Sequence, residues 1–342
     1  MAHLIAIDLA KNVFQLHGVD DRGTALFRKK LRREQVVPFF TTIEPTRIAM
    51  EAWATAHYWA RELSGLGDTV KLIAPQYVKP FVKRQKNDMA DAEAIAEAAQ
   101  RPSMRFVEPK SIEKQSRAAL FRTRDLLVRQ RTQLVNSLRG TLAEFGAISA
   151  KGIPQLSRLK SALEEADSHG LPEGVAELGK MYLGKIEDVS KEIDTLTLKI
   201  KAEGTSRPEL RRLQTMPGVG PIIALAIDSF VPDMKSFRRG RDFSAWLGLV
   251  PKQHSSGGKD RLGKTSKMGQ RDIRRLLISG AMAVLQWTQR SKKNIDPWLA
   301  RMLEKKPRLM VAVALANRMA RGLWAMTVKN EEFRPSHKKA IA

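Results

Sequence analysis

Four carboxylates within the first 91 residues of the chain have the types and spacing to bind a divalent cation. Asp8 and Glu51 each end a short apolar run that predicts a buried strand. Asp88 and Asp91 lie three residues apart at the start of a predicted helix, which puts them on one helical face. Carboxylates repel one another unless a cation holds them together, and Mg²⁺ prefers oxygen ligands. Such ions activate an attacking oxygen and stabilise a leaving oxygen at phosphorus.

Each of these carboxylates also has a structural explanation. Asp88 could cap the helix, Asp91 could interact with the helix dipole, and Asp8 could begin a turn. The combination is more specific than its members. A strand-end Asp, a strand-end Glu and an Asp-x-x-Asp pair, in this order, are the arrangement of RNase H-like and RuvC-like nucleases.

A second candidate site is the glycine- and lysine-rich segment from Gly248 to Lys264, which contains Ser256. Between Lys252 and Arg275 there are eight lysines and arginines but only two aspartates, a charge pattern that favours binding of a phosphodiester backbone. Ser256 could contact a phosphate or could be a nucleophile. The basic candidates for nucleic-acid binding are Lys252, Lys259, Arg261, Lys264 and Lys267.

The segment Pro217-Gly218-Val219-Gly220-Pro221 resembles the turn of a helix-hairpin-helix motif. In that motif glycines let backbone N–H groups face phosphates without reading the bases, so Gly218 and Gly220 are also candidates for nucleic-acid binding. The alternative is a plain turn between helices.

The composition fits a protein that binds nucleic acid. The chain has 342 residues, a formal net charge of +24 and 43% hydrophobic residues, enough for folded cores. The absence of cysteine excludes disulfides, thiolate-bound zinc and a cysteine nucleophile. No apolar run approaches the ~20 residues of a membrane span, so we expect no membrane association and a cytoplasmic location.

The elements that must position these residues divide the chain into an α/β part and all-α parts. Short strands alternate with helices over residues 1–107, which predicts an α/β domain. Residues 108–205 predict two long helices that form an arm, residues 206–329 a mainly helical C-terminal domain, and residues 330–342 a tail.

Heptad spacing marks the arm. Leu120, Leu127 and Leu134 are seven residues apart, as are Arg117, Arg124 and Arg131 on another stripe. An antiparallel hairpin within one chain and a coiled coil between subunits both fit this pattern.

Several motifs together resemble the DEDD transposases of the insertion-sequence 110 family. They are Ala6-Ile7-Asp8-Leu9-Ala10-Lys11, Met50-Glu51-Ala52, Lys86-Asn87-Asp88-Met89-Ala90-Asp91-Ala92, Met216-Pro217-Gly218-Val219-Gly220, and Gly248-Leu249-Val250-Pro251 through Ser256-Gly257-Gly258. The 1111 subgroup is similar through Ala56-His57-Tyr58-Trp59-Ala60-Arg61 and Ala74-Pro75-Gln76-Tyr77-Val78-Lys79-Pro80. The chain departs from that subgroup at Trp53-Ala54-Thr55, where smaller residues are usual.

This resemblance implies a RuvC-like N-terminal domain, a coiled-coil arm and a C-terminal transposase domain. Asp8, Glu51, Asp88 and Asp91 would be the catalytic tetrad that holds Mg²⁺, and Ser256 would be the nucleophile that forms a phosphoserine intermediate. The resemblance further implies an RNA-guided recombinase whose structured guide (bridge) RNA pairs with donor and target DNA. It also implies a prokaryotic protein, associated with the nucleoid when it acts, that assembles as a homodimer or homotetramer with tetrad and serine from different subunits.

Two other functions remain open from the residues alone. A RuvC-like Holliday-junction endonuclease would use metal-activated water, and Ser256 would only contact phosphate. A nucleic-acid-binding scaffold would use the carboxylates as caps. His57 and His254 are weaker candidates for proton transfer: His57 is expected to pack on its helix, and His254 lies about 6.6 Å from Ser256 along an extended chain.

Overall fold

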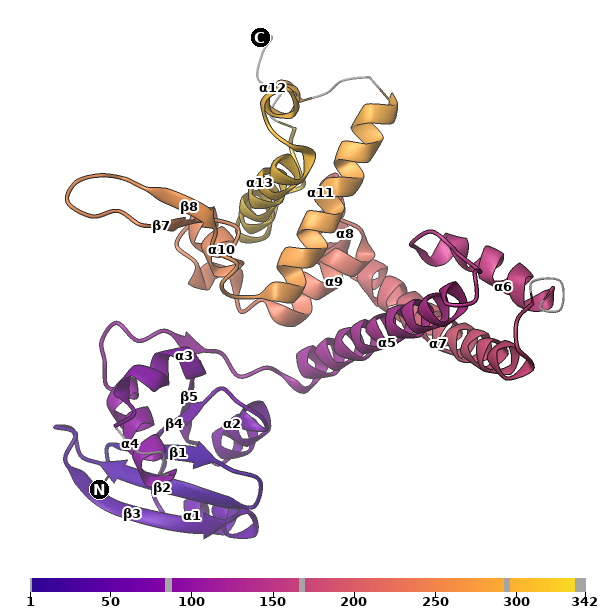
Figure 1. The fold of residues 1–342 in the computed structure, drawn as a ribbon. Helices are drawn as coiled ribbons and strands as arrows, with labels where there is room; N and C mark the ends of the chain where they lie inside the picture. The colour runs from indigo at the N-terminus through magenta and orange to yellow at the C-terminus, as the bar shows by residue number, and fades with distance from the viewer. Residues whose placement is uncertain (1, 84–87, 166–169, 292–295, 336–342) are drawn as a thin grey trace. The chain divides into compact units, whose positions relative to one another are not determined.

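The computed structural model describes residues 2–83, 88–165, 170–291 and 296–335. The chain forms two compact units, Met1–Gln115 and Ser116–Ala342, which are described separately. The first unit is mixed α/β and the second is mainly helical (Figure 1). The domain boundaries expected at residues 107 and 205 remain predictions. Within the described ranges, no helix is long and apolar enough to cross a membrane.

The first unit is built on a six-stranded sheet in the order β3-β2-β1-β4-β5-β6. Strands β1, β4 and β5 run parallel to one another, whereas β2, β3 and β6 pair antiparallel with their neighbours. The strands are β1 (Leu4–Leu9), β2 (Val13–Val19), β3 (Ala25–Arg32), β4 (Arg47–Glu51), β5 (Thr69–Ile73) and β6 (Phe106–Val107). The helices are α1 (Val36–Thr41), α2 (Ala56–Gly65), α3 (Pro75–Val78) and α4 (Asp88–Ala99).

Strand alternation divides this unit into two cores, one on each face of the sheet. Ile5, Ile7 and Met50 face the side covered by α1 and α2. Leu4 and Ala6 belong to the other core, beneath α3 and α4, which also contains Ala49 and the α4 side chain Ile95. Side chains one residue apart on a strand therefore lie in different cores, and this decides where the strand-end carboxylates face.

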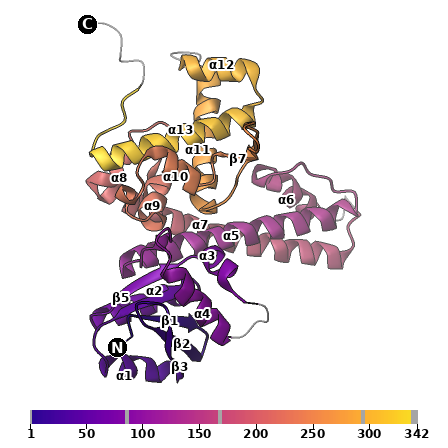
Figure 2. The ribbon, with the colours of Figure 1, turned by 90° about the vertical axis from the view of Figure 1, so that its left-hand side faces the viewer.

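The second unit contains the arm and a bundle of shorter helices (Figure 2). Its elements are α5 (Ile112–Ala143, which begins in the first unit), α6 (Leu156–Glu164), α7 (Glu173–Ser206), α8 (Pro208–Leu213), α9 (Pro221–Phe230), α10 (Gly240–Trp246), β7 (Pro251–Gln253), β8 (Leu262–Thr265), α11 (Arg271–Ser291), α12 (Pro297–Lys305) and α13 (Arg308–Lys329). The larger core contains side chains from every helix between α8 and α13, together with the adjoining parts of α5 and α7. A smaller core lies where α6 packs on the arm.

The arm is an antiparallel pair within this chain. Helices α5 and α7 lie side by side (Figures 1 and 2), and contacts that advance along α5 run backwards along α7. Arg124 Nε donates to Thr197 Oγ1 at 2.6 Å, and Arg131 Nη1 donates to Ser190 Oγ at 3.3 Å. Arg124 and Arg131 thus face α7, where hydroxyl side chains accept their hydrogen bonds, whereas Arg117 pairs with Asp228 of α9 at 3.1 Å. A coiled coil between subunits remains a prediction.

Candidate active site

Pairing of β1 with β4 brings two of the predicted carboxylates to neighbouring strand ends. Ile7 lies opposite Met50 in the parallel ladder, so Asp8 and Glu51 are the next positions on adjacent strands. Residues two apart on a strand point to the same face of the sheet, so Asp8 points to the face of Ala6 and Glu51 to the face of Ala49. Both alanines belong to the core beneath α4. Strand geometry therefore directs both carboxylates toward α4.

Helix α4 supplies the third carboxylate of this edge. Burial raises the pKa of Glu51, and the negative charge of Asp91 raises it further, so the two groups are electrostatic neighbours. Asp88 is the first residue of α4, but its side chain lies outside the described residues. We refer to Asp8, Glu51 and Asp91 as the acidic edge.

The acidic edge fits a cation by its electrostatics. Burial and the charge of Asp91 both disfavour ionised Glu51, and a bound cation would reverse both effects. Among the residues whose side chains are described, no three His, Asp or Glu groups form a ready-made metal site; the Asp88 side chain is outside that set. Mg²⁺ ligation by all four carboxylates is therefore a proposal.

We predict that Glu51→Gln stabilises the metal-free protein at neutral pH. Because the folded-state pKa of Glu51 is raised above 4.5, ionisation above that pH costs folding free energy that an amide would not cost. In EDTA at pH 7 the melting temperature should rise by about 2 °C, as expected for relief of under ~1 kcal/mol. The difference should vanish below pH 4, where both side chains are neutral. A lower melting temperature for Glu51→Gln at pH 7 would contradict this reading.

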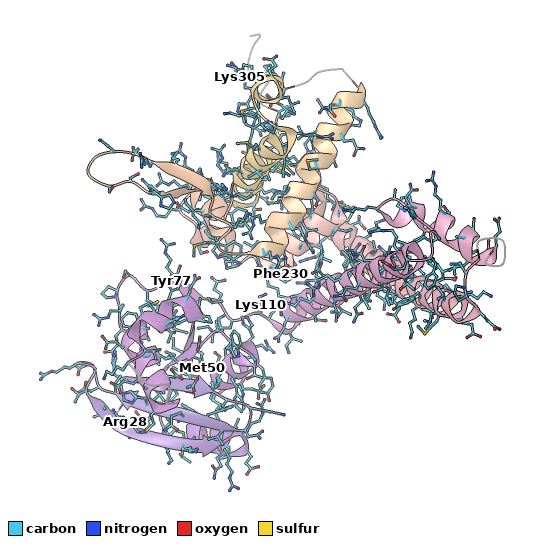
Figure 3. All side chains as sticks on the ribbon, in the orientation of Figure 1. Arg28, Met50, Tyr77, Lys110, Phe230 and Lys305 are labelled. Carbon is cyan, nitrogen blue, oxygen red and sulfur yellow. The ribbon has the colours of Figure 1, made fainter. Side chains whose placement is uncertain are left out.

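A buried histidine close to this region was missed from the sequence. His17 on β2 is buried and lies opposite Ala6 of β1 in the sheet. Arg28 Nε donates a hydrogen bond to its Nδ1 at 3.4 Å. Burial lowers the pKa of His17, with a further decrease from Arg28, which favours the neutral acceptor form of the imidazole. Arg28, labelled in Figure 3, also pairs with Glu93 of α4. The signal in the sequence is that this histidine stands in an apolar stretch, residues 13–19, within the part of the chain expected to form short strands.

The serine segment forms a β-hairpin. Strands β7 and β8 pair antiparallel, and the His254 backbone N–H donates to the Arg261 carbonyl at 2.8 Å. At the tip, Ser256 is bridged to Lys259 around Gly257 and Gly258, whose φ values are 57° and 76°. Two consecutive positive φ values are typical of a type I′ turn and strongly favour glycine. The Gly257-Gly258 pair is a recognised hairpin signal in the sequence, so this turn was predictable although no strands were expected here.

The two serines of the hairpin differ in their contacts. Ser255 Oγ donates to Asp260 Oδ1 at 2.9 Å and accepts from Gln253 Nε2 at 3.3 Å. Ser256 is exposed in the first position of the turn. The hydroxyl of Ser255 thus braces the hairpin across its two strands, whereas Ser256 is presented at the tip.

The base of the hairpin is fixed to the helical core. Arg274 Nη1 donates to the Leu247 carbonyl at 2.8 Å, and Asn317 Nδ2 of α13 donates to the Leu249 carbonyl at 3.0 Å. Arg274, one of the eight basic residues in this stretch, therefore has a structural role. The predicted phosphate-binding residues are all exposed, and they are Lys252, Lys259, Arg261, Lys264 and Lys267.

The glycine turn of the Pro217–Pro221 segment packs against α11. Gly218 has a φ of 82°, and a Cβ there would lie 2.7 Å from the Gly280 carbonyl oxygen. A Cβ on Gly280 would lie 2.2 Å from the Gly218 carbonyl oxygen. Gly220 is different, because it precedes α9 with open space around it. Close packing thus accounts for Gly218, and phosphate binding by either glycine remains a prediction.

We expect Gly280→Ala to destabilise the second unit. The added methyl group would collide with backbone that cannot move without separating the turn from α11, and overpacking of this kind costs about 1–3 kcal/mol. The matched control is Gly220→Ala, whose Cβ meets no atom within 4 Å. Thermal unfolding should show a clearly lower melting temperature for Gly280→Ala alone. Equal melting temperatures would mean that the turn does not pack as described.

His57 and His254 each make a hydrogen bond within their own unit. His57 Nδ1 accepts a hydrogen bond from the Lys110 backbone N–H at 3.2 Å, which holds the imidazole within the first unit. His254 contributes its backbone to the hairpin ladder. The partner of His57 is thus 53 residues away along the chain, and the expectation that His57 packs on its own helix stays a prediction.

Comparisons with known proteins cover both halves of this arrangement. A family model for DEDD transposases of the IS110 type, described as "Transposase", matches residues 5–146. A second, described as "Transposase IS116/IS110/IS902 family", matches residues 210–296. The first match includes the whole acidic edge, and the second includes the glycine turn and the serine hairpin.

Curated relatives match over nearly their full lengths. A "Probable family 20 transposase" of Pseudomonas aeruginosa is 45% identical, over 97% of this chain and 98% of that protein. The transposase for insertion sequence element IS1328 of Yersinia enterocolitica is 39% identical, over 96% and 98%. The transposase for insertion sequence element IS1111A of Coxiella burnetii is 37% identical, over 97% and 91%. The chain therefore belongs to the insertion-sequence 110 family of DNA transposases, as its motifs predict.

Proposed function

We propose that this transposase is an RNA-guided recombinase that cuts and rejoins DNA through a covalent bond to Ser256. The observation that carries the proposal is the exposed serine at the tip of a rigidly based, basic hairpin. Such a hairpin can bring a hydroxyl to a phosphodiester while its lysines and arginines bind the flanking backbone. The acidic edge of the first unit supplies the second part of the chemistry.

The first unit supports a RuvC-like assignment. Its strand order begins with three antiparallel strands and continues with two parallel ones, and its carboxylates stand at the ends of the two central strands and on the helix that covers them. RNase H-like nucleases share this plan. Asp8, Glu51, Asp88 and Asp91 would hold Mg²⁺, which when bound polarises the phosphate and stabilises negative charge on the leaving oxygen.

Ser256 would act as the nucleophile. Its Oγ attacks phosphorus and loses its proton, a P–Oγ bond forms, and the bond to one deoxyribose oxygen breaks. That oxygen takes up a proton and leaves as a free hydroxyl. The phosphoserine ester conserves the energy of the broken bond, so a hydroxyl of a second strand can reverse the reaction and join the strands without ATP.

The basic surface favours recognition of backbone rather than of bases. The protein has 60 Lys and Arg residues, but only 6% of its residues are aromatic. The protein therefore has few aromatic side chains on which bases could stack. Base pairing by a guide RNA would supply the sequence specificity instead. We further propose that the protein acts as a homodimer or homotetramer, in which the serine of one subunit works with the acidic residues of another.

A strand-joining assay tests this proposal. Full-length protein is incubated with Mg²⁺, donor DNA, target DNA and RNA transcribed from the flank of the element, and the new junctions are quantified by sequencing. We expect joined product only when all components are present. Joining at full rate without RNA would contradict the guide role. Cutting without joining would favour a junction endonuclease.

A further inference from the structure

A cavity with several charged side chains in its lining lies between α5, α9 and α11 of the second unit. Its volume is about 450 Å³, and Phe230, labelled in Figure 3, forms part of its wall. Its charged lining is Arg122, Arg124, Arg129, Arg275, Asp125 and Asp272. We call these residues the arginine cavity.

The cavity has more positive than negative charge after its ion pairs are counted. Asp125 accepts from Arg129 at 2.8 Å and also pairs with Arg275. One carboxylate thus serves two guanidinium groups. Arg122 lies over the ring of Phe230, with its Cζ 6.0 Å from the ring centroid, and no carboxylate of the described residues forms an ion pair with it.

Arg124 is the most constrained of these arginines. Its Nε donates to the neutral Thr197 hydroxyl, and among the described residues no carboxylate forms an ion pair with it. Burial is the largest cause that lowers the pKa of Arg124, and Arg131 and Arg275 lower it further, whereas the negative charges of Asp125 and Asp194 act in the opposite direction. A partly buried guanidinium that forms no direct ion pair is stabilised when an anion completes its site.

The chain leads from the serine hairpin to this cavity. The basic stretch that begins at Lys252 continues through β8 into α11, and its last member, Arg275, is a cavity residue. Cations therefore continue from the hairpin to the cavity within a single segment. A nucleic-acid strand bound to the hairpin could contact these basic residues one after another.

We propose that the arginine cavity binds a phosphodiester group of the nucleic acid on which the protein acts, with Arg122 and Arg124 as its direct ligands. The planar guanidinium offers paired N–H donors that match phosphate oxygens. This proposal rests on the proposed function, because it assigns a second anchor for the DNA or RNA strand. DNA and RNA share the chemistry concerned, and the experiment distinguishes them.

The test measures binding of full-length protein to labelled duplex DNA and to labelled flank RNA over a range of salt concentrations. The variants are Arg122→Gln and the double substitution Arg122→Gln, Arg124→Gln. The matched control is Arg158→Gln, which removes one exposed charge from α6. Loss of each phosphate contact should lower the slope of log K against log salt by about 1, and the double variant should bind about tenfold more weakly.

Each outcome has a defined meaning. Weaker binding and a lower slope for DNA, for RNA or for both, with the control unchanged, supports the site and identifies its ligand. Wild-type binding by the double variant overturns the site, and failure of the wild type to bind either probe would instead overturn the proposed function. If the double variant does not fold by circular dichroism, Arg122→Gln, at an exposed position, gives the same test with about half the effect.

Discussion

Replacing Ser256 with alanine should abolish strand exchange. If the Ser256 hydroxyl forms the covalent bond, its removal leaves no group that can conserve the phosphodiester energy, and the rate of joined product should fall by at least about 10³-fold. The hairpin should remain folded, because its turn depends on Gly257 and Gly258 and on backbone pairing. The measurement is the rate of junction formation at saturating DNA, RNA and Mg²⁺.

Ser255→Ala is the matched control for this substitution. It removes a hydroxyl one residue away, together with the hydrogen bond to Asp260, and should loosen the hairpin without removing the nucleophile. We expect a loss of about tenfold or less. A larger loss of joining rate for Ser255→Ala than for Ser256→Ala would mean that Ser255, not Ser256, is the nucleophile. Cutting that survives Ser256→Ala would favour water as the nucleophile.

The second large effect is expected at the acidic edge. Asp8→Asn and Glu51→Gln should each reduce DNA cleavage by at least about 10³-fold, because the amides keep the shape of the site but remove the charge that holds a cation. The loss should appear in formation of the cleaved strand, not only in joining. The measurement is single-turnover cleavage over a range of Mg²⁺ concentrations.

Asp21→Asn is the control for the acidic edge. Asp21 is exposed near the turn between β2 and β3, in the same unit. The Asp21→Asn variant should cleave DNA at the wild-type rate. A nucleic-acid-binding scaffold would give equal results for all three variants. Glu51→Gln should be more stable in EDTA and yet inactive, which is the combination expected of a residue retained for chemistry at a cost in folding.

Alternation of apolar residues made the core of the first unit predictable. The strand ends expected at Asp8 and Glu51 and the helix start expected at Asp88 agree with the structure to within one residue, because strands and helices differ in the period of their apolar residues. The meeting of Asp8 and Glu51 followed from parallel strands that end together. Their shared direction toward α4 required the observed register, since a shift of one residue in either strand would turn its carboxylate to the opposite face of the sheet.

Other features depend on contacts between distant segments and were not predicted. The seam of the arm places Arg124 and Arg131 against α7, whereas binary patterning puts apolar residues there. The closeness of Gly218 and Gly280 is likewise a property of packing, because neither glycine's neighbours along the chain reveal it.

Detection of a covalent protein–DNA intermediate is the most direct test of the account. Wild-type protein with Mg²⁺, guide RNA and end-labelled DNA is stopped in denaturant, digested with protease and nuclease, and examined by mass spectrometry. We predict a nucleotide attached to the peptide that contains Ser256, absent in EDTA and absent from Ser256→Ala. Cleaved DNA with free ends and no modified peptide would contradict the phosphoserine mechanism.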